Sequence, residues 1–149
     1  MFSLRKGIVG LLAGAAMIGT MLLQALPAFA ASTSISVTPA FQNIPAAGTN
    51  FTVQVVIDTD QPVRGVQFGL RYNPAVMRVN SVAEGNFLAD WAGAHNGETL
   101  VTPTFAINHT AGTIRNGGIA ILGGDPGGPT GTGVLLTLNC TSLANGDSP

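Results

Sequence analysis

The sequence has few charged residues, few aromatic residues and a single cysteine. Charged residues make up 9% of the 149 residues, and Lys6 is the only lysine. Binding to nucleic acid or to an anionic membrane surface needs clustered Lys and Arg, so we expect neither partner. Because Cys140 is alone, internal disulfides do not stabilise the fold. We expect Cys140 to be a small apolar residue on a strand, with an intermolecular disulfide as the alternative.

The first thirty residues have the features of a secretory signal peptide. Arg5 and Lys6 precede the uncharged run GIVGLLAGAAMIGTMLLQALPA, and residues 28–30 present the small-x-small pattern that a signal peptidase accepts. An uncleaved membrane anchor is the alternative, since the run is long enough to span a bilayer. Cleavage after Ala30 would release a secreted, extracellular chain with a net charge of about minus three, free or associated with the cell surface.

Residues 31–149 are long enough for one domain with one core. Within them, short runs alternate with a period of two and no helical period is sustained. In residues 51–58, Phe51, Val53, Val55 and Ile57 share one face, which predicts a half-buried strand. The alternation recurs in a second run, where the apolar face is formed by Val66, Phe68, Leu70 and Tyr72.

Further strands are expected around residues 35–37, 77–82, 100–108, 113–122 and 133–140, separated by segments rich in Gly and Pro. Residues 85–93 offer the one short helical turn. This spacing predicts an all-β, antiparallel sandwich. The final LANGDSP is a turn signal that should introduce a further strand, which leaves an edge or groove open to pairing.

Asn73 and Pro74 interrupt the alternation and predict a corner rather than a catalytic loop. Asn tolerates turn geometry, and Pro fixes one backbone angle and lacks an N–H donor. We expect the Tyr72 ring to be buried and its hydroxyl to bond to a nearby backbone group.

We expect no enzyme and no cofactor. A glycosidase needs two facing carboxyl groups across a cleft, whereas Glu84, Asp90 and Glu98 fall in loops of a small sandwich. His95 and His109 lie in predicted turns, apart from Cys140 and from each other, which favours surface histidines over a nucleophilic or zinc site.

Four segments of the chain follow one another in the order and spacing of a known family. They are VRGVQFGLRYNP, AVMRVNSVAEGNFL, AGTIRNGGIAILGGD and GTGVLLTLNC. Together they resemble the cohesin domains of bacterial cellulosome scaffolds, over about residues 35 to 143. The resemblance implies a nine-stranded jelly-roll β-sandwich, related in architecture to carbohydrate-binding modules, with its last strand or strands missing from this sequence.

The resemblance also implies a docking role. Cohesins bind a dockerin, a small module of paired calcium loops on a secreted glycoside hydrolase, through one flat face of the sandwich. The implied face consists of Gly65, Gln67, Gly69, Arg71, Asn108, Ile119, Ile121 and Asp125, with the two isoleucines as its apolar centre. Where well-known members carry outward Asn and Asp side chains, this chain has Gly65 and Gln67, and Gly124 replaces an acid.

We interpret the chain as a secreted, non-catalytic, cohesin-like module for a dockerin on a polysaccharide-degrading enzyme or on a surface protein. Direct polysaccharide binding is one alternative. It normally requires a coplanar row of exposed aromatic rings, and Trp91 is the one candidate for a sugar contact. We expect Trp91 instead to cap an end of the core. A structural adhesion domain is the third alternative.

Overall fold

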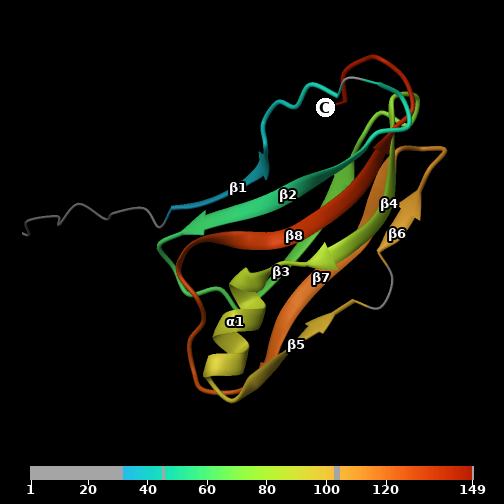
Figure 1. The fold of residues 1–149 in the computed structure, drawn as a ribbon. Coiled ribbons are helices and arrows are strands. Elements are labelled where there is room, and N and C mark those ends of the chain that lie inside the picture. The colour runs from blue at the N-terminus through green and yellow to red at the C-terminus, as the bar shows by residue number, and fades with distance from the viewer. Residues whose placement is uncertain (1–31, 45, 103–104, 149) are drawn as a thin grey trace, which may run out of the picture.

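The computed structural model describes residues 32–44, 46–102 and 105–148. They form eight strands and one short helix (Figure 1). In chain order these are β1 (Thr33–Thr38), β2 (Asn50–Thr59), β3 (Gly65–Arg71), β4 (Met77–Glu84), α1 (Asn86–Ala94), β5 (Gly97–Val101), β6 (Ala106–Asn108), β7 (Thr113–Gly123) and β8 (Gly131–Ser142).

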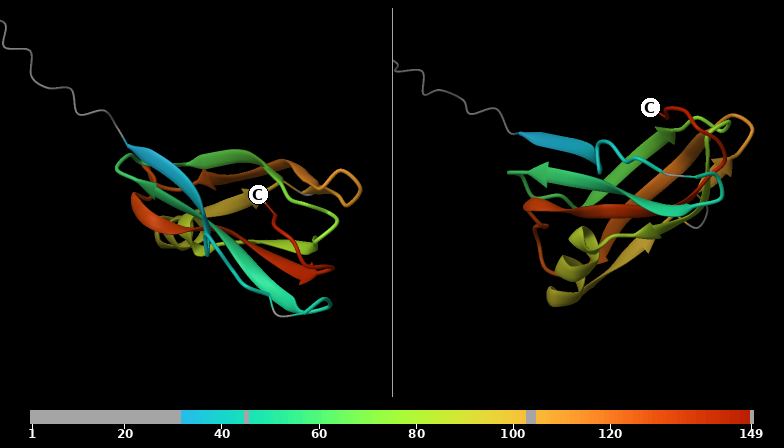
Figure 2. Two further views of the ribbon diagram at one scale, coloured as in Figure 1. Left: turned by 90° about the horizontal axis from the view of Figure 1, so that it is seen from above. Right: turned by 45° about the horizontal axis from the view of Figure 1, so that its top comes forward.

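The strands form two antiparallel sheets that face each other. Sheet A has the order β1-β2-β8-β4. Sheet B has the order β3-β7-β5, and β6 pairs with the start of β7 on the same side as β5. The two layers diverge toward the end where the C-terminal segment lies (Figure 2). The predicted antiparallel β-sandwich is therefore confirmed.

Alternation along the strands builds the core between the sheets. Val55 and Ile57 on β2, Val79 on β4 and Leu136 on β8 are fully buried, as the period of two requires. Cys140 is buried on β8 with a free thiol, which confirms its prediction as a small apolar residue on a strand. Val66, Phe68 and Leu70 are partly buried and pack against this core from β3.

A bulge interrupts β7 and changes which residues face the core. Phe68 pairs with Gly117, but Leu70 pairs with Ile114, so β7 carries one more residue than β3 over this stretch. Asn116 has a φ of 56°, a left-handed conformation that Asn tolerates better than most residues. As a result Ile114 and Ile119 both point inward, although they are an odd number of residues apart.

α1 covers one end of the sandwich, where it contacts β5, β7 and β8. It buries Phe87, Leu88 and Ala92. Gly85 precedes it at a close approach to β8, where a Cβ would collide with the carbonyl oxygen of Val134. The helical turn predicted for residues 85–93 is confirmed.

Asn73 and Pro74 form the predicted corner between β3 and β4. The Asn73 side-chain oxygen accepts a hydrogen bond from the N–H of Ala75 at 3.0 Å, and its carbonyl oxygen accepts one from Met77 at 3.1 Å. Tyr72 is buried as expected. However, its hydroxyl lies 3.2 Å from Nδ1 of His109, in the turn between β6 and β7, rather than against a backbone group.

Two predicted segments fall partly or wholly outside the described residues. The strand expected over residues 100–108 is found as β5 and β6, with residues 103–104 undescribed between them. The predicted signal peptide, residues 1–30, also lies outside. In the described ranges, no helix is long and apolar enough to cross a bilayer.

Candidate functional site

The outward side of sheet B carries most of the residues expected at the docking face. Gly65, Gln67, Gly69 and Arg71 are exposed on β3, because they alternate with the inward apolar residues of that strand. Asn108 is exposed on β6, in the same cross-strand row as Thr113 and Arg71. We call this side of β3, β7, β5 and β6 the outer face of sheet B.

Ile119 and Ile121 do not lie on this face, so their prediction as its apolar centre is wrong. Both are buried in the core between the sheets. The pairing register explains why: Ile119 lies opposite Val66 and Val101, which also point inward. The sequence IAIL is apolar at every position, so alternation alone could not decide which residues face out.

The apolar residues of the outer face lie one position along β7 from the predicted Ile119 and Ile121. Ala120 pairs with Gly65 on one side and with Leu100 on the other, and Leu122 pairs with Glu98. Leu100 is 51% exposed and Leu122 is 43% exposed. Sequence reasoning missed both leucines. Leu122 would have been found if Ala120 and Leu122, rather than Ile119 and Ile121, had been assigned to the outward side of β7.

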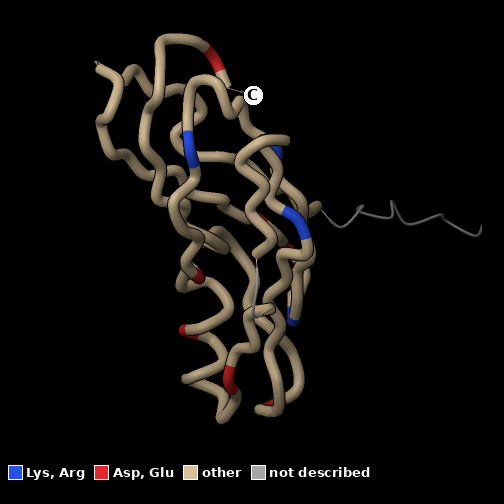
Figure 3. The backbone as a smooth tube through the Cα atoms, turned by 90° about the vertical axis from the view of Figure 1, so that its right-hand side faces the viewer, with Lys and Arg blue, Asp and Glu red and all other residues tan. Residues whose placement is uncertain are grey.

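Polar and charged groups occupy the rest of the outer face, with the exposed Glu98 opposite Leu122 and two arginines toward the other end of β7. Gln67, Gly69, Arg115 and Asn116 line a shallow hollow beside the bulge. Arg71 and Arg115 are both exposed. Most acidic residues of the described chain gather toward the end opposite the C-terminus, away from most of the arginines (Figure 3). The outer face thus combines an apolar patch with a cationic region.

Asp125, the last predicted face residue, is exposed in the loop between β7 and β8. Arg64 holds this loop, since its guanidinium donates to the carbonyl oxygens of Gly123 at 2.5 Å, Asp125 at 2.9 Å and Gly127 at 2.7 Å. The loop therefore has a fixed shape beside Leu122. Gly124 has a φ of 74°, a left-handed backbone conformation that is unfavourable in free energy for an acidic residue.

Trp91 is partly buried on α1 and packs against the core. Its ring stacks on His95 with centroids 4.0 Å apart, and the Arg64 guanidinium lies 5.8 Å from the ring centre. This placement matches the expected cap at one end of the core. Of the described residues, no three His, Cys, Asp or Glu side chains cluster as metal ligands would.

Two buried groups near the Asn73 corner have altered acidity. Burial raises the pKa of the Cys140 thiol to about 11. Burial also raises the pKa of the Tyr72 hydroxyl, with a further upward contribution from Cys140 and a downward one from Arg78. Both groups stay neutral at ordinary pH and belong to the core rather than to the outer face.

The fold defines the class of protein first: a two-layered antiparallel β-sandwich. The family model described as the cohesin domain matches residues 35–147, and the chain belongs to this family. No curated protein matches the chain.

A solved structure shares this fold. It is a chain in a type II cohesin–X–dockerin complex from Acetivibrio cellulolyticus, an N-terminal interface mutant. The TM-score is 0.54 at 12% sequence identity, and the match covers 79% of this chain and 74% of that one.

Proposed function

We propose that this chain is a non-catalytic docking module that binds a dockerin-bearing protein through the outer face of sheet B. The observation that carries the proposal is the pair Leu100 and Leu122, exposed on the same face of a paired sheet that carries Arg71 and Arg115 toward its other end. Membership of the cohesin-domain family supports the proposal, as does a similar fold in a complex that contains a dockerin.

The geometry suits recognition by a preformed surface. Backbone pairing already orders β3, β5 and β7, so binding would order few additional residues. The leucines would bury apolar area at the centre of the contact, and the polar residues around them would set its orientation. Arg71 and Arg115 favour a partner with carboxylates opposite them, which would also speed the encounter.

The biological setting belongs to the same proposal. The N-terminal sequence pattern supports export, and the partner would then be an extracellular enzyme of polysaccharide degradation or a surface protein. Direct polysaccharide binding has less support, because Trp91 is partly buried and stacks on His95 within the protein.

Substitution of Leu122 by Asp tests the docking face. The change puts a charge in the centre of the apolar patch, so we expect affinity for a calcium-loaded dockerin to fall roughly thirtyfold or more. The measurement is isothermal titration calorimetry with each dockerin encoded in the source genome.

Leu143→Asp is the matched control, since Leu143 is an equally exposed leucine, at 47%, outside the outer face. It should leave the affinity unchanged. Thermal unfolding of both variants checks that the fold is kept. Equal affinities for the two variants, or no binding of any dockerin by the unaltered protein, would refute the proposal.

A further inference from the structure

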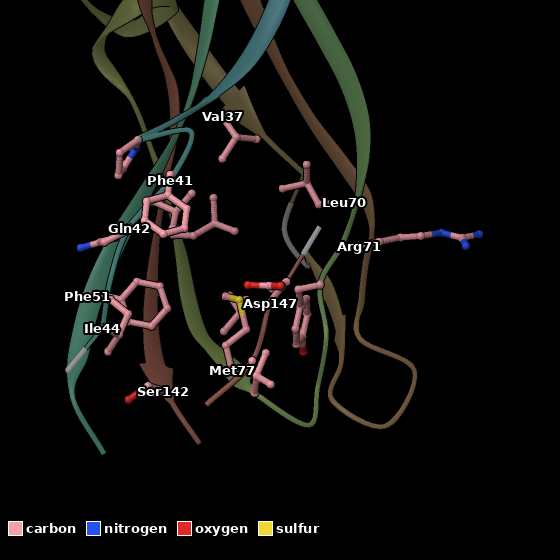
Figure 4. Close-up of a pocket in the computed structure, with 18 of the residues that line it drawn as sticks. Val37, Phe41, Gln42, Ile44, Phe51, Leu70, Arg71, Met77, Ser142 and Asp147 are labelled. Atoms are coloured by element: carbon pink, nitrogen blue, oxygen red, sulfur yellow. The ribbon is translucent and has the colours of Figure 1, made fainter. Parts of the chain in front are cut away.

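The outer face of sheet B carries opposite charges at its two ends. Two exposed arginines mark one end: Arg71 pairs with Thr113 at the start of β7, and Arg115 lies two residues further along that strand. Figure 4 shows that neighbouring residues of β3 point in opposite directions, since Leu70 points into the pocket between the layers and the Arg71 guanidinium points away from it. This end of the outer face is cationic.

Carboxylates mark the opposite end. Glu98 is exposed on β5 and pairs with the exposed Leu122. Asp125 is exposed in the loop after β7, where its N–H donates to the carbonyl oxygen of His95 at 2.9 Å. Arg64 lies at the same end, but three carbonyl oxygens of the loop accept hydrogen bonds from its guanidinium. Two carboxylates beside this one guanidinium leave the end with a net negative charge.

The two ends act on a bound protein separately. Arg115 and Leu122 are seven residues apart on β7, a distance of roughly 20 Å at the rise of a β-strand. The small residues Gly118 and Ala120 lie on the strand between them. Charges in solution are screened over about 8 Å at physiological ionic strength, so neither end neutralises the other.

We propose that the outer face accepts its protein partner in one orientation only, with partner carboxylates beside Arg71 and Arg115 and a partner cation beside Glu98. This inference rests on the docking proposal and specifies the chemistry of the partner surface. An apolar side chain of the partner contacts Leu100 and Leu122 near the anionic end. The reverse orientation places like charges against each other at both ends, which disfavours it.

The shallow hollow beside the bulge gives a partner carboxylate a place at the cationic end. It is lined by Gln67, Gly69, Arg115 and Asn116. Local packing does not require a glycine at position 69, because a Cβ there would meet no atom closer than the carbonyl oxygen of Ile114, at 3.6 Å. The missing side chain leaves room beside Arg115, and a guanidinium binds a carboxylate with two parallel hydrogen bonds.

Charge reversal at each end tests the proposal, with the dockerins encoded in the source genome as partners. Arg115→Glu should weaken binding roughly tenfold or more at about 50 mM salt and less at about 500 mM, because salt screens the charges. Glu98→Lys should weaken it roughly threefold or more. Gly69→Thr, which fills the hollow and leaves the charge unchanged, should also weaken it. Titration calorimetry measures the affinities, and thermal unfolding checks each fold.

Arg78→Glu is the matched control, because Arg78 is an exposed arginine on β4 in sheet A. It should leave the affinity unchanged. The sign of the Glu98→Lys effect is decisive. A partner that is acidic at both ends of its contact surface could bind in either orientation, and it would bind Glu98→Lys more tightly. That result, or unchanged affinity in both Glu98→Lys and Arg115→Glu, would overturn the proposal.

Leu122→Asp separates this proposal from the docking proposal. Loss of binding in Leu122→Asp, together with unchanged affinity in the charge variants, would refute the single orientation and leave the docking face standing. Failure of every dockerin to bind the unaltered protein would refute the docking proposal itself, and the single orientation with it.

Discussion

Cys140 illustrates how burial alone gives a residue its properties. It lies on β8, fully buried and opposite Phe51 and Val79 in the neighbouring strands. The apolar surroundings disfavour the thiolate and raise the pKa of the thiol to about 11 from its ordinary value of 9.0. The residue therefore acts in the fold as a small apolar side chain and is a poor nucleophile.

The raised pKa predicts a loss of stability in alkaline solution. Below pH 9 the thiol is neutral in both the folded and unfolded states, so its ionisation does not lower the free energy of unfolding there. Between pH 9 and pH 11 the unfolded state ionises first, and the free energy of unfolding falls by up to about 2.5 kcal/mol. Urea denaturation across this range measures the fall.

The comparison uses Cys140→Ala, which lacks the thiol but keeps Tyr72. Tyr72 also has a raised pKa and contributes in the same direction above pH 10. The free energy of unfolding of the variant should therefore fall less steeply with rising pH than that of the unaltered protein. This comparison of slopes holds whatever the absolute stability of the variant. Identical slopes would show that the thiol does not titrate differently in the two states.

Residue type predicted burial well where apolar and polar side chains alternate and poorly where they do not. On β2, Val55 and Ile57 continue the every-second-residue apolar series of Phe51 and Val53, and their burial followed from the pattern. On β7, Ile119 and Leu122 belong to one unbroken apolar run, and only the pairing register separates core from surface. The resemblance to a family implied outward positions for Ile119 and Ile121, and the structure buries both in the core.

At the scale of elements, the bulge in β7 determines the side on which each of its residues lies. Asn116 provides the left-handed residue of the bulge, and its carbonyl oxygen accepts a hydrogen bond from the Thr102 hydroxyl at 3.0 Å. Thr102 also bonds to the backbone of Gly118, so β5 and β7 are joined beside the bulge. A sequence with Asn-Gly in a strand hints at a bulge, but its effect on register depends on the partner strand.

Substitutions at Asn116 test this role. Asn116→Ala should lower the free energy of unfolding by about 1 kcal/mol, because a left-handed backbone is unfavourable for Ala. Asn116→Gly should stay within about 0.5 kcal/mol of the unaltered protein, since Gly adopts that conformation readily. Chemical denaturation of the two variants measures the difference, and an equal loss in both would contradict the assigned conformation.

At the scale of the molecule, the sequence predicted two antiparallel layers because alternation and turn residues are local signals. It could not predict how the layers lie over each other, which depends on contacts between distant strands. The exposure of Ile35 and Val37 is one example, since the sequence predicts a strand around residues 35–37 but not what lies against its apolar side. The fold was thus more predictable than the surfaces that it leaves open.

Export of the chain is a prediction about the whole molecule. Expression of the full sequence in a secreting bacterial host should release a protein whose N-terminus is Ala31, because the pattern at residues 28–30 suits a signal peptidase. N-terminal sequencing of the culture medium measures this. Retention of the intact chain in the membrane fraction would favour the anchor alternative.

The three hydrogen bonds from Arg64 to the loop after β7 fix the shape of that loop without a bound ion. Three carbonyl oxygens converge on one guanidinium and accept its hydrogen bonds, much as backbone carbonyl oxygens surround a metal cation in other proteins. Here the cation is part of the polypeptide, so the shape of the loop next to Leu122 does not depend on a bound metal ion.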